Sequence, residues 1–102
     1  MKKKPKKVTN VIKLVKECLE SGRYYYTEHV NERCEERNVT RPEIEYVLKN
    51  GRHEPKDDDY DSLHKNWKYA IGGKTVDESK LRVFVSFDTN RMMIITVFWL
   101  DD

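Results

Sequence analysis

The chain has few of the residues that mark disulfide-rich or membrane proteins. It contains two cysteines in 102 residues, Cys18 and Cys34, which are too few and too far apart for a disulfide framework. Both fall at helix positions that suit a small apolar residue, so we expect reduced, partly buried thiols. No apolar run approaches the length of a membrane span, and the basic start leads into an amphipathic segment without a signal-type apolar core. We therefore expect a cytoplasmic protein without a membrane partner.

Several catalytic motifs are also missing. The sequence holds no Gly-rich phosphate loop, nucleophile elbow or paired-carboxylate motif, so nothing supports nucleotide hydrolysis, acyl transfer or glycoside cleavage. His53 and His64 with Cys34 are the nearest approach to a zinc set, but they lack paired ligand spacing. The acidic run 57–61 lacks the Gly and the terminal Glu of a calcium loop, and we expect it to be a solvated loop. The prediction is no metal and no cofactor.

The net charge of +2 hides an asymmetry along the chain. Five lysines precede the first apolar segment, and removing them from the 20 basic residues leaves 15 against 18 acidic residues, or −3 from Val8 onward. A slightly acidic body gives no evidence for a dedicated nucleic-acid-binding domain. We expect residues 1–7 to form a basic flexible tail and residues 8–102 to form a single domain; a phosphate-binding arm is the alternative for the tail.

Helical periodicity dominates the first half of the chain. We expect helices over residues 9–21, between caps at Thr27 and Asn38, and from Thr40 to Asn50-Gly51. The third has the clearest start, because Thr40 and Glu43 form a capping box with Pro42 in the first turn. This box also fixes where the preceding helix must end.

After Gly51 the pattern changes to alternation. We expect strands over residues 67–71, 81–87 and 92–100, an edge strand near 52–56 and a tight connection over 88–91. The last two strands carry apolar residues on both faces, so one face packs on the helices. The other face, carrying Lys68, Arg82, Phe84, Ser86 and Thr96, is a plausible binding surface. The expected class is α+β, with two to three N-terminal helices followed by a three- to four-stranded antiparallel sheet.

The most informative stretch is the second helix, where His29, Arg33 and Arg37 recur every fourth residue. This spacing places one imidazole and two guanidinium groups along one stripe. His29 lies in the first helical turn, where the helix dipole favours a neutral imidazole that can serve as a base. The arginines border the buried face and must pair with carboxylates such as Glu36, Glu43 or Glu45, or with an incoming phosphate. The alternative is a purely structural lattice that holds the helix in place.

A mixture of aromatic and basic side chains suits single-stranded RNA, which is held by base stacking and phosphate contacts. Its members are Tyr24, Tyr25, Tyr26, Lys65, Trp67, Lys68, Arg82, Phe84 and Trp99. We expect Tyr26, Lys65, Arg82 and Phe84 to bind RNA. The alternative is that the strand aromatics fill the core, as we expect for Trp67 and Tyr69.

The His-x3-Arg-x3-Arg pattern, the following Val-Thr-x-x-Glu-Ile-x-x-Val-Leu-x-x-Gly and the final Ile94-Ile95-Thr96-Val97-Phe98 resemble a prokaryotic family of unknown function. That family is similar to the RelE/ParE-like toxin superfamily, which includes the BrnT and MqsR types. The resemblance covers most of the chain from Tyr26 onward. It implies a small RelE-like α+β fold, metal-independent cleavage of RNA and neutralisation by an antitoxin-like protein, although fold alone does not carry function.

Three positions depart from the MqsR type. Lys68 stands where that type has a glutamine, Trp99 where a basic residue follows the last strand, and Arg82 where the penultimate strand has a tyrosine. The catalytic set of that type therefore cannot be carried over. We predict a toxin-like RNA endonuclease that uses the 2′-hydroxyl, with catalytic residues His29, Arg33, Arg37 and Lys68. A non-catalytic RelE-like module that binds a protein partner or RNA is the alternative, and the sequence gives no oligomeric state.

Overall fold

The computed structural model describes residues 4–100 as three α-helices, a short 3-10 helix and six strands. The elements are α1 (Val11–Ser21), β1 (Tyr24–Tyr26), α2 (Glu28–Arg37), α3 (Arg41–Asn50), β2 (Arg52–His53), η1 (Pro55–Asp57), β3 (Asp59–Asp61), β4 (Asn66–Lys74), β5 (Lys80–Phe87) and β6 (Met92–Trp99). The α+β class, with the helices first and the sheet after them, is confirmed.

The sheet is larger than expected and mixed. Its strand order is β1-β6-β5-β4-β2, and β3 pairs with β4 beyond the short β2. The centre is the expected antiparallel meander β4-β5-β6, but β1 runs parallel to β6, with Tyr24 opposite Met92 and Tyr26 opposite Ile94. Three consecutive tyrosines are typical of a strand. The sequence did not predict this strand, because Tyr26 also fits the helical periodicity of the residues that follow it.

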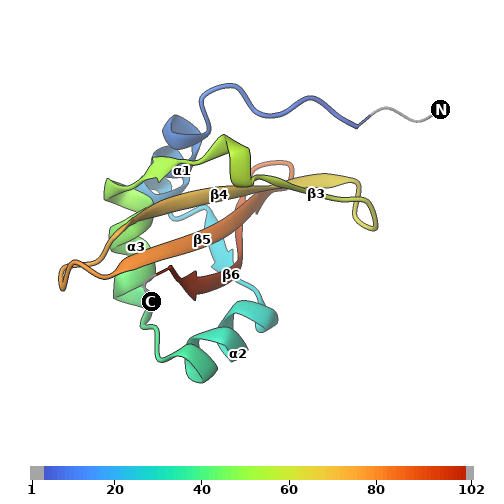
Figure 1. Cartoon of the computed structure of the whole chain (residues 1–102). Helices are drawn as coiled ribbons and strands as arrows, with labels where there is room; N and C mark the ends of the chain where they lie inside the picture. The colour runs from blue at the N-terminus through green and yellow to red at the C-terminus, as the bar shows by residue number, and fades with distance from the viewer. Residues whose placement is uncertain (1–3, 101–102) are drawn as a thin grey trace.

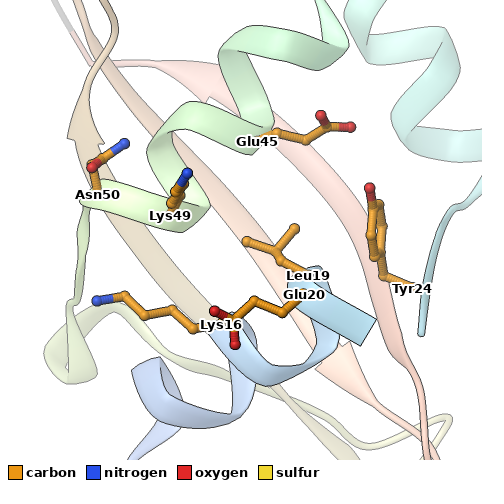
Figure 2. Close-up of a pocket in the computed structure, with 7 residues that line it drawn as sticks. All are labelled: Lys16, Leu19, Glu20, Tyr24, Glu45, Lys49 and Asn50. Carbon is orange, nitrogen blue, oxygen red and sulfur yellow. The ribbon is translucent and has the colours of Figure 1, made fainter. Parts of the chain in front are cut away.

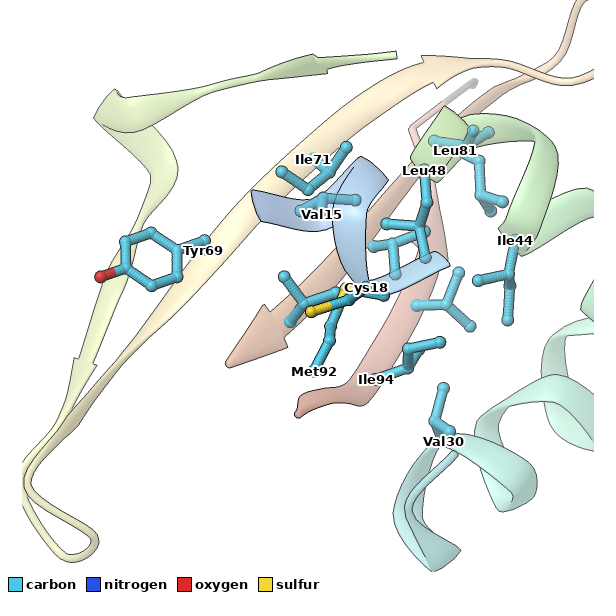
Figure 3. Packing of buried hydrophobic residues seen from close by; sticks show 14 of the residues in the cluster. Val15, Cys18, Val30, Ile44, Leu48, Tyr69, Ile71, Leu81, Met92 and Ile94 are labelled. Atoms are coloured by element: carbon cyan, nitrogen blue, oxygen red, sulfur yellow. The ribbon is translucent and has the colours of Figure 1, made fainter. Parts of the chain in front are cut away.

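The core lies between the sheet and the helices α1 and α3 (Figure 3). Val15 and Cys18 of α1 and Ile44 and Leu48 of α3 are fully or almost fully buried. They pack on strand residues that alternate along β4, β5 and β6, namely Tyr69, Ile71, Leu81, Val83, Val85, Met92, Ile94 and Val97. The residues between these point to the other face of the sheet, which α1 and α3 do not cover.

Helix α2 lies apart from α1 and α3, alongside β6 where the short β1 has ended (Figure 1). Its start is held by Thr27, whose Oγ1 donates to the carbonyl of Ile94 at 3.1 Å and accepts from the N–H of Val30 at 3.2 Å. Its end is held by Trp99, whose Nε1 donates to the carbonyl of Arg37 at 2.7 Å. Both ends of the helix are therefore fixed to β6.

The predicted helix caps are confirmed. Thr27 and Asn38 cap α2, and Thr40 and Glu43 form the complete capping box of α3. The expected solvated loop over 57–61 is wrong, because Asp57 belongs to η1, the side chain of Asp58 is fully buried, and β3 pairs with β4 from Asp59 opposite Lys68 to Asp61 opposite Asn66. Charged residues face solvent on one side of this two-stranded hairpin, which is why they are compatible with a strand.

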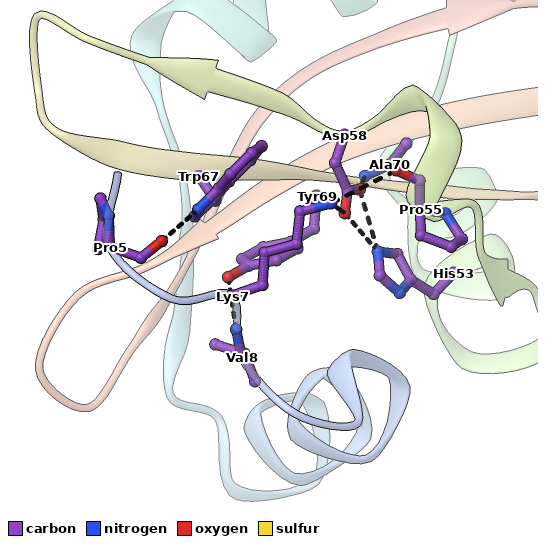
Figure 4. Close-up of polar contacts among 9 residues, drawn as sticks. All are labelled: Pro5, Lys7, Val8, His53, Pro55, Asp58, Trp67, Tyr69 and Ala70. Carbon is purple, nitrogen blue, oxygen red and sulfur yellow. Dashed lines mark hydrogen bonds and ion pairs between the residues drawn. The ribbon is translucent and has the colours of Figure 1, made fainter. Parts of the chain in front are cut away.

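Part of the predicted basic tail is seen in contact with the domain (Figure 4). The indole Nε1 of Trp67 donates to the carbonyl of Pro5 at 2.8 Å, and Lys7 Nζ lies 3.0 Å from Asp58 Oδ2. Residues 1–3 and 101–102 of the predicted tail and domain lie outside the described residues. Among residues 4–100, no helix is both long enough and apolar enough to cross a membrane.

Candidate functional site

The face of the sheet opposite α1 and α3 holds a pocket of about 460 Å³, here called the histidine pocket. Its lining comes from α2, the β3–β4 hairpin and the strands between them: Thr27, His29, Asp61, His64, Asn66, Lys68, Ser86, Asp88, Met93 and Ile95. His29 and His64 thus meet at one hollow although 35 positions separate their numbers in the sequence. A concave site with convergent titratable groups is the usual form of an active site.

The turn that joins β3 to β4 sets the position of His64. Asp61 Oδ1 accepts hydrogen bonds from the backbone N–H groups of Leu63 at 3.0 Å and His64 at 3.2 Å, which folds the turn around the carboxylate. Lys65 closes the turn with a positive φ of 54°. The other carboxylate oxygen, Oδ2, lies 2.7 Å from His64 Nδ1.

This contact has an electrostatic consequence. The hydrogen bond from the His64 side chain, with the backbone N–H of the same residue, holds the pKa of Asp61 below its usual value. Asp61 is therefore a carboxylate at neutral pH and can accept a hydrogen bond from His64 Nδ1. When Nδ1 donates to Asp61, Nε2 is the ring atom left for a ligand.

His29 enters the pocket from the first turn of α2. Thr27 is the cap of this helix, and its hydroxyl and N–H both donate to the carbonyl of Ile94 in β6. His29 is exposed, and within residues 4–100 its ring makes no hydrogen bond or ion pair. It therefore offers both ring nitrogens to a ligand.

The floor of the pocket differs from its rim, because the polar side chains of the floor already make hydrogen bonds within the protein. Ser86 Oγ donates to the carbonyl of Trp67 at 2.8 Å, and Asn66 Nδ2 donates to the carbonyl of Phe87 at 2.9 Å. Met93 and Ile95 complete the floor with apolar surface. A ligand would contact apolar or already hydrogen-bonded side chains on this floor, and it would contact reactive side chains only at the rim.

Lys68, a predicted catalytic residue, lies in the pocket as expected from its place on β4. Its ammonium group is 3.4 Å from Asp59 Oδ2, and Asp59 is two-thirds exposed. Such an exposed pair contributes little, so the charge of Lys68 remains open to an anionic ligand.

The two arginines of the α2 stripe have different partners. Arg33 Nη1 lies 2.7 Å from Glu36 Oε1, which is one of the expected pairings. Arg37 Nη1 instead donates to the backbone carbonyl of Val97 at 2.6 Å, and its guanidinium carbon lies 5.9 Å from the centre of the Phe98 ring. The stripe therefore follows the pocket side of β6, although only His29 is part of the lining.

Two of the predicted RNA-binding residues lie on the same face, further from the histidines. Arg82 is held by Glu54 at 2.9 Å and by Asp57 at 3.0 Å, so carboxylates neutralise its charge. Phe84 pairs with the ring of Phe98, with centroids 5.9 Å apart.

The other two lie elsewhere. Tyr26 packs on the core side, where its hydroxyl donates to Glu45 Oε2 at 2.5 Å, and Lys65 lies in the hairpin turn next to His64. Cys18 and Cys34 are free thiols, as expected. In the described part of the chain no three metal-ligating side chains gather, so Cys34, His53 and His64 do not form a zinc site.

A second pocket of about 510 Å³ lies between α1 and α3 (Figure 2). It is lined by Lys16, Leu19, Glu20, Tyr24, Glu45, Lys49 and Asn50. Two lysines balance two glutamates there, and Glu45 already accepts the hydrogen bond of Tyr26. It lacks a histidine, so the histidine pocket is the better candidate for chemistry.

Sequence reasoning missed His64 and Asp61. In the sequence alone Asp61 belongs to an acidic run that is typical of a loop, and His64 belongs to a set with weak zinc-ligand spacing. Nothing in the sequence indicates that the hairpin folds toward α2. The available signal was the Asp-x-x-His spacing of Asp61 and His64 in a turn, where an aspartate commonly bonds the backbone that follows it.

Residues 26–99 match the model of a protein family described as Domain of unknown function (DUF4258). No curated protein and no solved structure matches the chain. The expectation of a family of unknown function is therefore confirmed, while the RelE-like relationship stays a prediction. The matched segment contains the whole histidine pocket, whereas α1 and the N-terminal arm precede it.

Proposed function

The chain belongs to the DUF4258 family, and we propose that it is a metal-independent endoribonuclease whose general base and general acid are His29 and His64. The observation that carries the proposal is the convergence of these two histidines and Lys68 on one apolar-floored pocket. Two imidazoles with different surroundings can divide the roles of base and acid at neutral pH.

The surroundings suggest which histidine does what. His29 lies in the first turn of α2, and its ring has no hydrogen-bond partner among residues 4–100, so we assign it as the base. His64 Nδ1 lies against the carboxylate of Asp61, which orients the ring and leaves Nε2 as the atom that we assign as the proton donor. The side chain of His64 is 73% exposed, so a substrate phosphate can reach it.

The reaction follows from these roles. His29 accepts the proton of a ribose 2′-hydroxyl, and the 2′-oxygen forms a bond to the adjacent phosphorus. The bond from phosphorus to the 5′-oxygen of the next nucleotide breaks, and His64 protonates that oxygen. The products are a 2′,3′-cyclic phosphate and a 5′-hydroxyl, and Lys68 stabilises the charge that develops on the phosphate.

The biological role in this proposal is that of a toxin neutralised by an antitoxin-like protein. Its support is the resemblance of the α2 stripe and the last strand to a family of unknown function, which in turn is similar to the RelE/ParE-like toxins. A non-catalytic module that binds RNA or a protein is the second candidate, and the pairing of Arg82 with two carboxylates favours it. Induced expression of the wild type and of His29→Ala separates the two, because growth arrest that needs His29 in a folded protein indicates an enzyme.

The direct test incubates the purified full chain with end-labelled single-stranded RNA in the presence of EDTA. We expect fragments that end in 2′,3′-cyclic phosphate, and no cutting of the same sequence with 2′-deoxyribose at every position. His29→Ala and His64→Ala should each lower the rate by about 100-fold or more. Cleavage of the all-deoxy strand, or full activity in both variants, would refute the mechanism.

His53→Gln is the matched control. His53 is the remaining histidine of the three in the chain, lies outside the pocket and contacts Asp58 through Nε2 at 2.8 Å. Glutamine keeps an N–H donor for Asp58, so this variant should fold and retain activity. Equal loss of activity in all three histidine variants would point to a folding defect and against the assignment.

A further inference from the structure

The surface next to the histidine pocket continues along the same face of the sheet. Ser86 and Met93 are paired across β5 and β6 in the pocket floor, and the next pairs on this face are Phe84 with Thr96 and Arg82 with Phe98. Successive pairs on one face are about 7 Å apart along the strands. The side chains of Phe84 and Phe98, here called the aromatic patch, therefore lie one and two steps from the pocket.

The aromatic patch is partly open to solvent. The two rings are tilted by 34° with their centroids 5.9 Å apart, and both side chains are of intermediate exposure. On the helix side of the sheet, by contrast, the strand residues beside them, Val83, Val85 and Val97, are fully buried. The core is thus complete without the patch, and ring surface remains for a ligand.

Two guanidinium groups flank Phe98, and they differ in charge balance. Arg82 lies 6.0 Å from the ring centre and is paired with Glu54 and Asp57. Arg37 lies 5.9 Å from the ring centre, is exposed, and has no carboxylate partner within residues 4–100. Its one bond to the carbonyl of Val97 fixes the guanidinium beside the patch and leaves other N–H groups for an anion.

We propose that the aromatic patch and Arg37 form a nucleotide subsite, in which an unpaired base of single-stranded RNA stacks on Phe98 and its phosphate binds Arg37. The subsite rests on the proposed function, since the histidine pocket defines the position of the phosphate that is cleaved. The side of the face toward α2 binds the strand, because Glu54 and Asp57 occupy the other side around Arg82.

The chemistry selects an unpaired nucleotide. A base can lie flat on an aromatic ring only when it has left its own stack, so a duplex should bind poorly. The unbalanced charge of Arg37 complements a phosphate and offers nothing to an apolar protein segment. An aromatic face flanked by a guanidinium is also tolerant of sequence, because every base has a π-face.

The test measures binding without cleavage. The probe is a fluorescently labelled single-stranded oligonucleotide with 2′-O-methyl ribose at every position, which has no 2′-hydroxyl to attack with, and the readout is fluorescence anisotropy. Phe98→Leu keeps apolar volume but removes the ring, and we expect its Kd to rise about fivefold or more. A probe without bases should bind the wild type and Phe98→Leu equally, because it has phosphates but nothing to stack.

Arg37→Gln tests the phosphate contact. We expect the slope of log Kd against log salt concentration to fall by about 0.7, the value for one phosphate of a single strand. Arg23→Gln is the matched control, since Arg23 Nε donates to the backbone carbonyl of Asn90 as Arg37 does to that of Val97, but far from the patch. Phe87→Leu, on the core side of β5 against Tyr69, is the control for Phe98.

An unchanged Kd in folded Phe98→Leu, or tighter binding of the duplex than of the single strand, overturns the subsite. Because the probe cannot be cut, this failure is separate from that of the catalytic proposal. Stacking that depends on Phe98, combined with an absence of cleavage of natural RNA, would retain the subsite and reject the enzyme.

Discussion

The fully buried carboxylate of Asp58 accepts a hydrogen bond from the backbone N–H of Ala70 at 2.9 Å. The same side chain lies 2.8 Å from His53 Nε2 and 3.0 Å from Lys7 Nζ (Figure 4). Asp58 therefore satisfies the edge of β4 in the gap between its pairings with β2 and β3, and it joins that edge to the N-terminal arm.

Replacing this carboxylate should be costly. In Asp58→Ala the N–H of Ala70, the ring of His53 and the ammonium group of Lys7 lose their partner, and we expect the free energy of unfolding to fall by about 2 to 3 kcal/mol. Urea denaturation measures this loss. Trypsin should also cut after Lys7 faster than in the wild type, because the arm is released.

Asp59→Ala is the control for this prediction. Asp59 is the next residue and its ion pair with Lys68 is mostly exposed, so its removal should change the stability by less than about 1 kcal/mol. Equal stability of the two variants would mean that burial of Asp58 contributes nothing.

Two glycines should respond to alanine for different reasons. At Gly51 an added Cβ would lie 2.4 Å from the carbonyl oxygen of Gly72 and 2.6 Å from that of Val47, and neither backbone atom can move freely. We expect Gly51→Ala to destabilise the protein by about 3 kcal/mol. At Gly22 the space is open and only the positive φ of 74° opposes a side chain, so Gly22→Ala should cost about 1 kcal/mol.

Thermal or urea unfolding of both variants checks this order. A Gly51→Ala protein as stable as Gly22→Ala would mean that α3 and β4 do not approach as closely as the structure has them.

The helices could be predicted from the sequence because their signals are local. Thr27 and Asn38 at the ends of α2, and the box of Thr40 and Glu43, each act within four residues. The central strands were also predicted, because their apolar residues are numerous. The short strands β1 and β3 were not, since each exists only through pairing with a strand distant in the sequence, β6 or β4.

The same limit applies to the site. His29 and Lys68 were predicted from their own elements, and both line the histidine pocket. His64 was missed because its role depends on the direction in which the β3–β4 hairpin projects. The sequence did not predict that Glu54 and Asp57 pair with Arg82. These two acidic residues lie at the start and at the end of η1, and no periodicity indicates that this turn lies next to Arg82.

Tyr26 should be a structural tyrosine with an unusual titration. Burial disfavours the phenolate, and the hydrogen bond to Glu45 favours the neutral phenol, so both raise the pKa of Tyr26. The ordinary tyrosine pKa is about 10, so we expect Tyr26 to remain protonated at about pH 11. The ultraviolet absorbance of phenolate at that pH should then rise when the wild type unfolds, and this rise should be smaller in Tyr26→Phe.

The stability that Tyr26 contributes follows the same sign. A raised folded pKa means that the contribution is complete below the unfolded pKa of about 10 and is lost as the pH rises further. Tyr26→Phe leaves Glu45 without its donor and should cost about 1.5 kcal/mol at neutral pH. A Tyr26→Phe protein whose phenolate absorbance rises on unfolding as much as that of the wild type would show that another residue is responsible.

Asp61 provides the pH prediction for the histidine pocket. Its pKa is lowered from 3.8, first by the hydrogen bond from the His64 side chain. His64→Ala removes that bond, so we expect the pKa of Asp61 to rise toward 3.8, as followed by NMR of its carboxyl carbon. His53→Gln, which alters a histidine away from this turn, should leave the titration of Asp61 unchanged.

The lowered pKa of Asp61 also fixes how the pair affects stability. The contribution is present above 3.8 and is lost as the pH falls through the lowered value, so the wild type and His64→Ala should become equally stable in acid. Because His64 is largely exposed, the difference in stability between the wild type and His64→Ala at neutral pH should be small. A loss of cleavage in Asp61→Asn cannot then be ascribed to unfolding. It would instead mean that the carboxylate orients His64 as the proton donor. An Asp61→Asn enzyme as active as the wild type would remove Asp61 from the mechanism and leave His64 without an orienting partner.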